Sequence, residues 1–271
     1  MTDYSVLMSV YHKEKAINLS EAINSMLRQT VMTNDFVIVC DGPLNKSLDD
    51  VIEDFDKSHP GLFNIVRLEK NGGLANALNK GMKYCKNEII ARMDSDDISE
   101  ANRMAKQLEA LEEQHADIVG SYVVEFNGTL SNKGGKRIVP VEDEDIKAFA
   151  KKRNPFNHPS VVFKKNKVEA AGGYPRYDYF EDYALWVTML SQGDKGYNVG
   201  EVLVNMRAGD ELYNRRGGLG YVKCIVRFNK YMKELGYITT KQFLTQSAAR
   251  SIVSIMPNFV RKFLYKKKLR G

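Results

Sequence analysis

Apolar and polar residues follow two alternating periods over the first 125 residues of the chain. Short apolar runs predict buried strands, and stretches with apolar residues three or four positions apart predict helices. The predicted strands are YSVLMSV (4–10), DFVIVCD (35–41), FNIVRLE (63–69), EIIARMD (88–94) and ADIVGSYVVEF (116–126). The predicted helices lie between them, at 16–29, 48–57, 71–85 and 99–114. This order predicts an α/β fold with a mostly parallel sheet covered by helices on both faces.

The second half of the chain has a less regular pattern. It predicts a hairpin or loop at 127–140, helices at 142–152 and 181–192, strands at 159–165 and 196–207, and a helical region from 217 almost to the end. The sequence contains neither internal repeats nor low-complexity linkers. We therefore expect residues 1–216 to form one domain, whose halves 1–125 and 126–216 share a core, followed by a helical extension at 217–271.

The composition is that of an ordinary soluble globular protein. The 271 residues are 43% hydrophobic and 27% charged, and the chain is long enough to bury a sizeable core. The early acidic residue and short apolar run at the N-terminus do not predict a signal peptide, and no apolar run approaches the roughly 18 residues of a membrane-spanning helix. Three cysteines without metal-type spacing, Cys40, Cys85 and Cys224, favour a reducing cytoplasm.

Charge is distributed unevenly along the chain. The formal net charge is +6, but acidic residues dominate at 41–56 and 94–117, and the chain ends in the basic run RKFLYKKKLRG. A basic tail can bind nucleic acid or anionic lipid, or it can have no specific partner. The sequence lacks the aromatic and RNP-type patterns of the common RNA- and DNA-binding modules, so we do not expect nucleic acid as a partner.

Three aspartates, Asp94, Asp96 and Asp97, follow the fourth predicted strand, at the edge where parallel sheets bind ligands. Close carboxylates repel one another unless a cation or strong donors hold them, and oxygen-only ligands suit Mg²⁺ or Mn²⁺ rather than zinc. The alternative is that these acids cap the next helix and complement its dipole. Ser99 can itself cap that helix, which makes three aspartates redundant for this purpose and favours a metal–phosphate site.

Five motifs carry a resemblance to a known family. SVLMSVYHKE, FVIVCDG, NGGLANALNKG, ARMDSDD and YFEDYALW resemble, in order and approximate spacing, the motifs of family 2 glycosyltransferases. The resemblance covers residues 4–216 and implies a GT-A fold and a nucleotide-sugar donor. The segments NHPSVVF and MRAGDELYNRRGG look like those of bacterial enzymes that build exopolysaccharide, capsule or lipopolysaccharide.

The resemblance implies a nucleotide pocket at the ends of the first two strands. Val10 and Tyr11 match positions that line the base pocket, with the aromatic ring against uracil, and Glu14 matches an acid near the ribose. Asp41 matches the acid that accepts the uracil N3–H. The structural alternatives are that Tyr11 merely covers the strand end and that Asp41, with the glycine after it, starts a turn.

The resemblance also implies a donor-binding loop between the third and fourth strands. Asn71, Gly73 and Asn79 match this loop and its helix, and glycine permits close approach of the backbone to the donor. Relatives often carry a basic residue where this chain has Asn76, which leaves a phosphate contact from that position in doubt. A simple Asn-Gly turn into a helix explains the NGG sequence almost as well.

The acidic motif Asp94-Ser95-Asp96 resembles the DxD motif of the family. This resemblance implies that Asp94 and Ser95 face the ribose or sugar, and that Asp96 binds Mn²⁺ or Mg²⁺ with Asp94. Asp97 contacts the metal, directly or through water, or braces the loop. The metal neutralises the charge that develops on the departing diphosphate.

A later stretch, MRAGDELYNRRGG, contains three arginines. The resemblance implies that Arg207, Arg215 and Arg216 add positive charge near the diphosphate. The alternative is that they belong to a solvated surface loop.

The YFEDYALW motif resembles the family's catalytic ED motif. It implies that Asp182 takes the proton of the acceptor hydroxyl, which attacks the anomeric carbon from the face opposite the nucleotide, with Glu181 beside it. Adjacent carboxylates near the aromatic Trp186 can raise one pKa toward a useful range. His158 matches an acceptor-side position, as does Trp186. Helix capping is the alternative for the two acids, and a structural role for the histidine.

The C-terminal segment combines apolar and basic residues. Apolar residues recur at helical spacing, interrupted by Pro257: Ile252, Ile255, Met256, Phe259, Val260, Phe263 and Leu264. Lysines and arginines surround them, as in helices that lie on anionic membranes. The alternatives are that this stripe packs on the catalytic domain or forms a dimer contact, so the oligomeric state is left open.

Taken together, these patterns predict an inverting, metal-dependent glycosyltransferase. It would move a hexose or N-acetylhexosamine from a UDP-sugar to a saccharide acceptor on a polyprenyl diphosphate, in the cytoplasm at the inner face of the membrane. A sugar-phosphate nucleotidyltransferase is one alternative, but it would usually have a Gly-rich basic loop after the first strand, and YHKEKAIN contains no glycine. The other alternative is an inactive nucleotide-sugar-binding module, against which the intact Asp41, Asp94, Asp96 and Asp182 argue.

Overall fold

A computed structural model of the chain describes residues 2–207 and 217–256. The strands are β1 (Tyr4–Val10), β2 (Asp35–Cys40), β3 (Phe63–Arg67), β4 (Ile89–Asp94), β5 (Ile98–Ser99), β6 (Ile118–Asn127), β7 (Thr129–Arg137), β8 (Val162–Lys164) and β9 (Gly196–Arg207). The helices are α1 (Ala16–Leu27), α2 (Lys46–Ser58), α3 (Leu74–Met82), α4 (Arg103–Glu113), α5 (Asp143–Ala150), α6 (Lys165–Ala170), α7 (Glu181–Ser191), α9 (Gly218–Glu234) and α10 (Thr240–Ile255), with a 3₁₀ turn at His158–Ser160.

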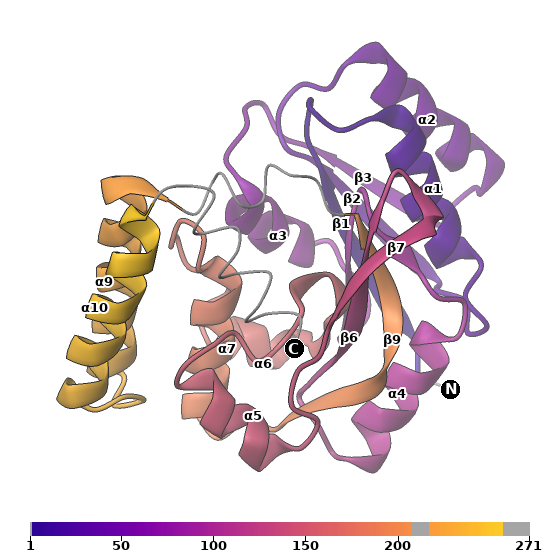
Figure 1. Cartoon of the computed structure of the whole chain (residues 1–271). Coiled ribbons are helices and arrows are strands. Elements are labelled where there is room, and N and C mark those ends of the chain that lie inside the picture. The colour runs from indigo at the N-terminus through magenta and orange to yellow at the C-terminus, as the bar shows by residue number, and fades with distance from the viewer. Residues whose placement is uncertain (1, 208–216, 257–271) are drawn as a thin grey trace.

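The described strands form a single sheet in the order β3-β2-β1-β4-β8-β6-β9-β5, with β7 paired to β6 (Figure 1). The first four strands in this order are parallel, as predicted, and β6 pairs with β9 in parallel as well. Strand β8 is antiparallel to both β4 and β6 and joins the two halves of the sheet. The halves therefore share one sheet.

The parallel strands end at one edge of the sheet because their registers are aligned. Val10 pairs with Cys40, and Ser9 pairs with Asp94. The loops that follow β1, β2 and β4 consequently lie next to one another. This confirms the predicted edge and places Tyr11 and Asp41 beside the acidic cluster.

Both faces of the sheet are buried, which explains the continuous apolar strands. In β2, Phe36 and Ile38 belong to the core under α1, α2 and α4, whereas Val37 and Val39 belong to the core under α3, α5, α6 and α7. Figure 1 shows these two helical layers on opposite sides of the sheet.

The start of α4 differs from the prediction. Residues Ile98–Ser99 form the short strand β5, which pairs antiparallel with β9, and the helix begins only at Arg103. The backbone N–H of Ser99 donates to Ser25 Oγ on α1 (3.0 Å), so the expected helix from residue 99 and the expected cap at Ser99 are wrong. The free edge of β9, distant in sequence, offers these residues a backbone partner that no local pattern reveals.

The described part of the C-terminal extension, 217–256, consists of α9 and α10 joined by a short turn at 235–239. Helix α9 packs on α7 through aromatic residues, and the rings of Phe180 and Phe228 stack with their centroids 4.7 Å apart. Helix α10 begins with a capping box between Thr239 and Gln242 and folds back on α9. Within the described ranges, none of the helices combines the length and apolar character needed to span a bilayer.

Candidate active site

The ends of β1 and β2 are joined by their backbones. The N–H of Asp41 donates to the carbonyl of Val10 (2.8 Å), and the Val10 side chain is buried in the core. Val10 therefore offers the site only backbone, whereas the Tyr11 ring is 36% exposed and free to receive a planar ligand. Glu14, at the start of α1, accepts a hydrogen bond from Asn18 Nδ2 (2.8 Å).

Asp41 holds the glycine loop that precedes α3. Its two carboxylate oxygens accept the backbone N–H groups of Gly72 (2.8 Å) and Gly73 (3.0 Å), and Asn71 Nδ2 donates to its carbonyl (3.1 Å). Gly73 has φ of +84°, a conformation that glycine adopts without strain. The structure thus brings together the three predicted residues Asp41, Asn71 and Gly73, and it adds a loop-holding role for Asp41 that sequence reasoning missed.

Asn79 faces away from this loop. Its amide Nδ2 donates to the carbonyl of Tyr174 (2.7 Å), and its Oδ1 accepts the N–H of the same residue (2.8 Å). Both polar atoms of the amide are engaged in this reciprocal pair, which ties α3 to the segment before α7. This contradicts the expected contact of Asn79 with the donor.

The acidic loop after β4 gathers three carboxylates. Oxygens of Asp94, Asp96 and Asp97 lie within 4.8 Å of one another. Burial, followed by the charges of Asp94 and Glu14, raises the pKa of Asp96 to about 7. Burial, followed by the charges of Asp94 and Asp96, raises the pKa of Asp97 well above its ordinary value. The loop therefore concentrates negative charge that a bound cation would stabilise.

Two arginines hold this loop. Arg92, on β4, is only 1% exposed and contacts both carboxylate oxygens of Asp94, with Nη1 at 2.8 Å from Oδ2. At the end of β9, the backbone N–H of Arg207 donates to Asp97 Oδ1 (2.7 Å), and its Nε donates to the carbonyl of Asp96 (2.9 Å). Sequence reasoning missed Arg92, although a charged residue within an otherwise apolar strand was a usable signal.

The remaining donors of Arg207 also contact protein. Nη2 forms an ion pair with Glu21 (2.6 Å), Nη1 donates to the carbonyl of Gly128 (2.9 Å), and the guanidinium lies over the Phe126 ring. Arg207 therefore positions the acidic loop, which corrects the expectation that it binds the diphosphate. Arg215 and Arg216 lie outside the described residues.

The acidic loop fits a divalent cation. Oδ2 of Asp97 is buried and has no hydrogen-bond partner among the described residues, so one carboxylate oxygen is left for another ligand. All the grouped ligand atoms are carboxylate oxygens, the set that Mg²⁺ and Mn²⁺ prefer. Ser95 is buried within the same loop.

The second acidic group lies in the first turn of α7. Asp182 Oδ2 accepts a hydrogen bond from Asn154 Nδ2 (2.6 Å), and its Oδ1 accepts the N–H of Tyr183 (2.7 Å). Burial and the neighbouring Asp182 charge raise the pKa of Glu181 to about 7. Arg92 opposes this rise, because its positive charge reaches Glu181 as well as the acidic loop. Asn154, which orients Asp182, had no recognisable motif in the sequence.

Trp186 belongs to the core rather than to a binding surface, and the partly buried His158 packs beside it. Trp186 is 0% exposed, and the rings around it are those of Phe156, His158, Phe163 and Tyr174. His158 Nε2 lies 3.3 Å from the Tyr174 hydroxyl, and burial together with the Arg92 charge keeps the pKa of His158 well below its ordinary value. The expected acceptor contact of Trp186 is therefore wrong. The acceptor-side position of His158 stays a prediction.

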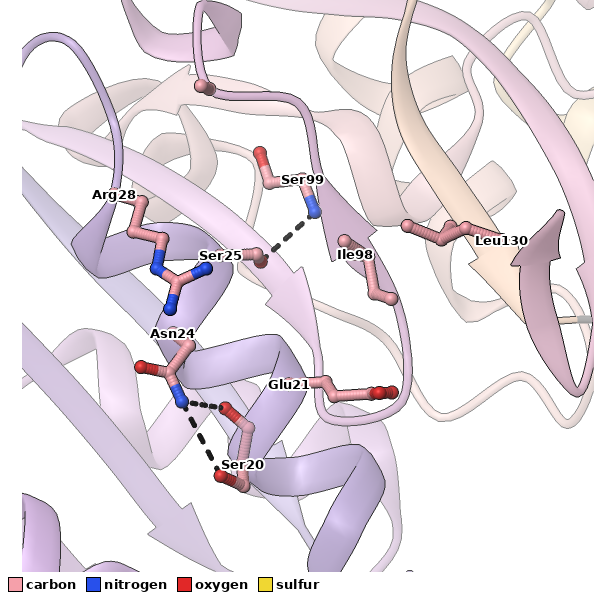
Figure 2. Close-up of a pocket in the computed structure, with 9 residues that line it drawn as sticks. Ser20, Glu21, Asn24, Ser25, Arg28, Ile98, Ser99 and Leu130 are labelled. Atoms are coloured by element: carbon pink, nitrogen blue, oxygen red, sulfur yellow. Dashed lines mark hydrogen bonds between the residues drawn. The ribbon is translucent and has the colours of Figure 1, made fainter.

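A pocket of about 350 Å³ lies beside the acidic loop, between α1, β5 and β7 (Figure 2). Its described lining residues are Ser20, Glu21, Asn24, Ser25, Arg28, Ile98, Ser99, Ala101 and Leu130. None of the predicted site residues is among them. Glu21 connects the pocket wall to Arg207 and so to the acidic loop.

Comparison with known proteins agrees with the motifs. The model of glycosyl transferase family 2 matches residues 5–169. This chain belongs to glycosyltransferase family 2. An amylovoran biosynthesis glycosyltransferase of Erwinia amylovora is 40% identical over 99% of this chain and 100% of the relative. A UDP-Gal:alpha-D-GlcNAc-diphosphoundecaprenol beta-1,3-galactosyltransferase of Escherichia coli is 36% identical over 98% of this chain and 96% of the relative.

Solved structures show the same fold. TarS (residues 1–349) of S. aureus in complex with UDP-GlcNAc matches with a TM-score of 0.69 and 15% identity, over 99% of this chain and 76% of that one. A mannosyltransferase of Pyrobaculum calidifontis in complex with GDP-Man and Mn²⁺ matches with a TM-score of 0.64 and 15% identity, over 97% of this chain and 79% of that one. The predicted GT-A fold of this family 2 glycosyltransferase is thereby confirmed.

Proposed function

We propose that the protein transfers a hexose or N-acetylhexosamine from a UDP-sugar to a saccharide on a polyprenyl diphosphate, in the synthesis of a cell-surface polysaccharide. The galactosyltransferase relative named above uses a GlcNAc-diphosphoundecaprenol acceptor, and so does a β-1,3-glucosyltransferase of Escherichia coli that is 27% identical over 72% of this chain. N-acetylglucosamine linked through diphosphate to a polyprenol is therefore the acceptor that we propose.

The observation that carries this proposal concerns the buried guanidinium of Arg92. Both the acidic loop after β4 and the acidic first turn of α7 lie within reach of its charge. Arg92 contacts Asp94 directly, and its charge also acts on Glu181. A transferase needs a site that stabilises the leaving diphosphate and another that accepts the proton of the attacking hydroxyl. The acidic loop supports the first role, and the start of α7 supports the second.

For the donor, we propose that Tyr11 receives the uracil ring and that Asp41 lies beside the base while it holds the loop at Gly73. Asp94, Asp96 and Asp97 would hold Mn²⁺ or Mg²⁺, which supplies positive charge opposite the departing diphosphate. Arg207 keeps the loop in place through Asp97 and the Asp96 carbonyl.

For the acceptor, we propose that Asp182 takes the proton of the attacking hydroxyl, with inversion at the anomeric carbon. The hydrogen bond from Asn154 Nδ2 to Asp182 Oδ2 orients the carboxylate that would accept this proton. Glu181, whose pKa is about 7, shares the local charge with Asp182.

The test is transfer by the purified protein with Mn²⁺ and a synthetic N-acetylglucosaminyl diphosphate lipid. UDP-galactose, UDP-glucose and UDP-N-acetylglucosamine are offered separately, and the product is identified by its mass. We expect one of these donors to extend the lipid with release of UDP, and we expect Asp182→Asn to abolish the extension. Formation of UTP and sugar 1-phosphate from the UDP-sugar when pyrophosphate is added would indicate a nucleotidyltransferase instead. Absence of any extended lipid would overturn the proposed acceptor.

We also propose that the reaction takes place in the cytoplasm, with the enzyme in peripheral contact with the inner face of the membrane. A lipid-linked acceptor keeps its diphosphate at the headgroup level, so an enzyme that uses it works at that surface.

A further inference from the structure

Helix α10 carries exposed apolar residues that an ordinary surface helix would bury. Its buried residues are the serines Ser247 and Ser254, and Ser247 Oγ accepts a hydrogen bond from Asn229 of α9 (3.0 Å). Phe243 packs partly buried against the cluster of α7 and α9. Three other large apolar residues are exposed: Leu244 by 59%, Ile252 by 58% and Ile255 by 61%. A helix that only packed on its neighbour would place these side chains inward.

The exposed apolar residues form a continuous stripe. Leu244, Ala248, Ile252 and Ile255 are spaced by four, four and three positions, which places them on one face of the helix. At about 1.5 Å per residue, the stripe is roughly 16 Å long. Figure 1 shows the α9–α10 hairpin at the edge of the molecule, beyond α7. We define the outer face of α10 as this stripe.

The extension that carries this face is rich in basic residues. Residues 217–271 contain twelve lysines and arginines and a single acid, Glu234, whereas the rest of the chain has more acids than bases. Within the described part, Lys223, Lys230 and Lys241 are exposed on the two helices of the hairpin. The extension is thus both apolar on its outer face and cationic around it.

We propose that the outer face of α10 docks on an anionic lipid bilayer. Leucine and isoleucine side chains enter the interface, and the surrounding lysines contact anionic headgroups, the combination that binds interfacial helices to such membranes. A second copy of the chain is a poor occupant, because its own extension carries the same high positive charge. This inference rests on the proposed function and names the surface through which the enzyme meets its lipid-linked acceptor.

The docked face is connected directly to the acceptor side of the site. Helix α10 packs on α9, and α9 packs on the start of α7 through Phe228 and Phe180. Phe180 immediately precedes Glu181 and Asp182. Two helices therefore separate the bilayer from the proposed base, which suits an acceptor whose diphosphate lies among the headgroups.

The test is cosedimentation of the full chain with vesicles, in the absence of sugar nucleotide and acceptor. We expect the wild type to sediment with vesicles of equal parts phosphatidylglycerol and phosphatidylcholine, and to bind pure phosphatidylcholine vesicles far more weakly. Leu244→Ser/Ile252→Ser should weaken binding to the anionic vesicles about tenfold or more, because it removes two interfacial side chains. The matched control is Met32→Ser/Ile138→Ser, which removes two exposed apolar residues elsewhere and should bind like the wild type.

Either of two results would overturn the proposal: a wild type that stays in the supernatant, or a Leu244→Ser/Ile252→Ser variant that sediments like the wild type. Light scattering tests a second copy of the chain as the occupant instead. If the variant converts a dimer to a monomer and its vesicle binding is unchanged, the stripe is a dimer contact. The substituted residues are exposed, so both variants should keep the wild-type melting temperature. This test measures membrane binding and not sugar transfer. The docking proposal can therefore fail while the proposed reaction is confirmed, and the reaction can fail while docking is confirmed.

Discussion

The backbone N–H of Arg207 donates a hydrogen bond of 2.7 Å to Asp97 Oδ1, across 110 positions of sequence. Arg207 is the last residue of β9, and Asp97 lies in the acidic loop after β4. The Arg207 side chain adds a bond to the carbonyl of Asp96 and an ion pair to Glu21. The end of one strand thus holds the loop that follows another, and it does so through both its backbone and its side chain.

Arg207→Met should therefore loosen the acidic loop without removing a metal ligand. The backbone bond to Asp97 remains, but the bonds to the Asp96 carbonyl and to Gly128 are lost. We expect the affinity for Mn²⁺ to fall about tenfold, as is typical when support of a metal ligand is removed. Calorimetric titration with Mn²⁺ measures this. The control is Glu21→Gln, which removes only the exposed ion pair with Arg207 and should change the affinity for Mn²⁺ little. If Arg207→Met binds Mn²⁺ as tightly as the wild type does, Arg207 does not hold the acidic loop.

Arg92 is the cation on which both acidic groups depend, so its replacement should be damaging even by lysine. Lysine keeps the charge but cannot reproduce the two-point contact with Asp94. We expect Arg92→Lys to lower the free energy of unfolding by about 2–4 kcal/mol, because the two buried charges keep only part of their pairing. Urea denaturation measures this loss. The matched control is Arg137→Lys, whose partner is Glu125 and whose side chain is half-exposed; a comparable loss there would show that Arg92 has no special role.

The strands and the order of motifs could be predicted from the sequence because both are local patterns. The continuous apolar runs of β1, β2 and β4 indicate strands that are buried on both faces of the sheet. Parallel strands bring their carboxyl ends to one edge of the sheet, whatever the sequence of the loops. For that reason the meeting of Tyr11, Asp41 and the acidic loop followed from the pattern alone.

Partners distant in sequence could not be predicted in this way. Asn79 and Arg207 are residue types that suit a donor site, yet each binds protein groups more than 90 positions away. Trp186 lies five positions beyond Glu181, on a helix that is buried on nearly every side, so its neighbours are core rings. Residue type and spacing describe what a side chain can bind, whereas only the packed fold decides which partner takes it.

Asp97→Asn should separate metal binding from stability. The substitution removes the buried member of three clustered like charges, and the new amide can donate to the neighbouring carboxylates. We expect the metal-free protein to gain about 1–2 kcal/mol of unfolding free energy, since like-charge repulsion is relieved. The rise in melting temperature on adding Mn²⁺ should disappear, because a bound ligand stabilises only the state that binds it. Thermal melts with EDTA and with Mn²⁺ test both effects. The control is Asp56→Asn, on the exposed face of α2. If Mn²⁺ raises the melting temperature of Asp97→Asn as much as that of the wild type, Asp97 is not a metal ligand.

Asp182→Asn should lower kcat without changing the KM for the UDP-sugar. The amide cannot accept the hydroxyl proton, and general-base catalysis is worth about 10²–10⁴-fold in rate. The proposed donor residues are untouched, so donor binding should persist. Asn154→Ala, which removes only the hydrogen bond that orients Asp182, should reduce kcat by a smaller factor of about ten. Steady-state kinetics with varied donor measures these constants, and a normal kcat in Asp182→Asn would exclude it as the base.

Glu181→Gln should change how stability depends on pH. The pKa of Glu181 rises from 4.5 to about 7 on folding, chiefly through burial, so the folded state disfavours the ionised form. The stability that the protonated group contributes is complete below pH 4.5 and is lost as the pH rises through about 7. Glutamine is neutral throughout. Relative to the wild type, the variant should therefore gain stability between pH 5 and pH 8, by about 2 kcal/mol after allowance for the partial exposure of the group.

Urea denaturation at pH 5 and pH 8 measures this difference directly, because only the change between the two conditions reports the ionisation of Glu181. Any packing effect of the amide is the same at both pH values and cancels. Glu112→Gln, on the exposed side of α4, is the matched control and should shift stability equally at both. A constant offset for Glu181→Gln, or a larger gain at pH 5 than at pH 8, would mean that Glu181 is already ionised in mildly acidic solution. The first turn of α7 would then hold two charged carboxylates, and Arg92 would have to stabilise both.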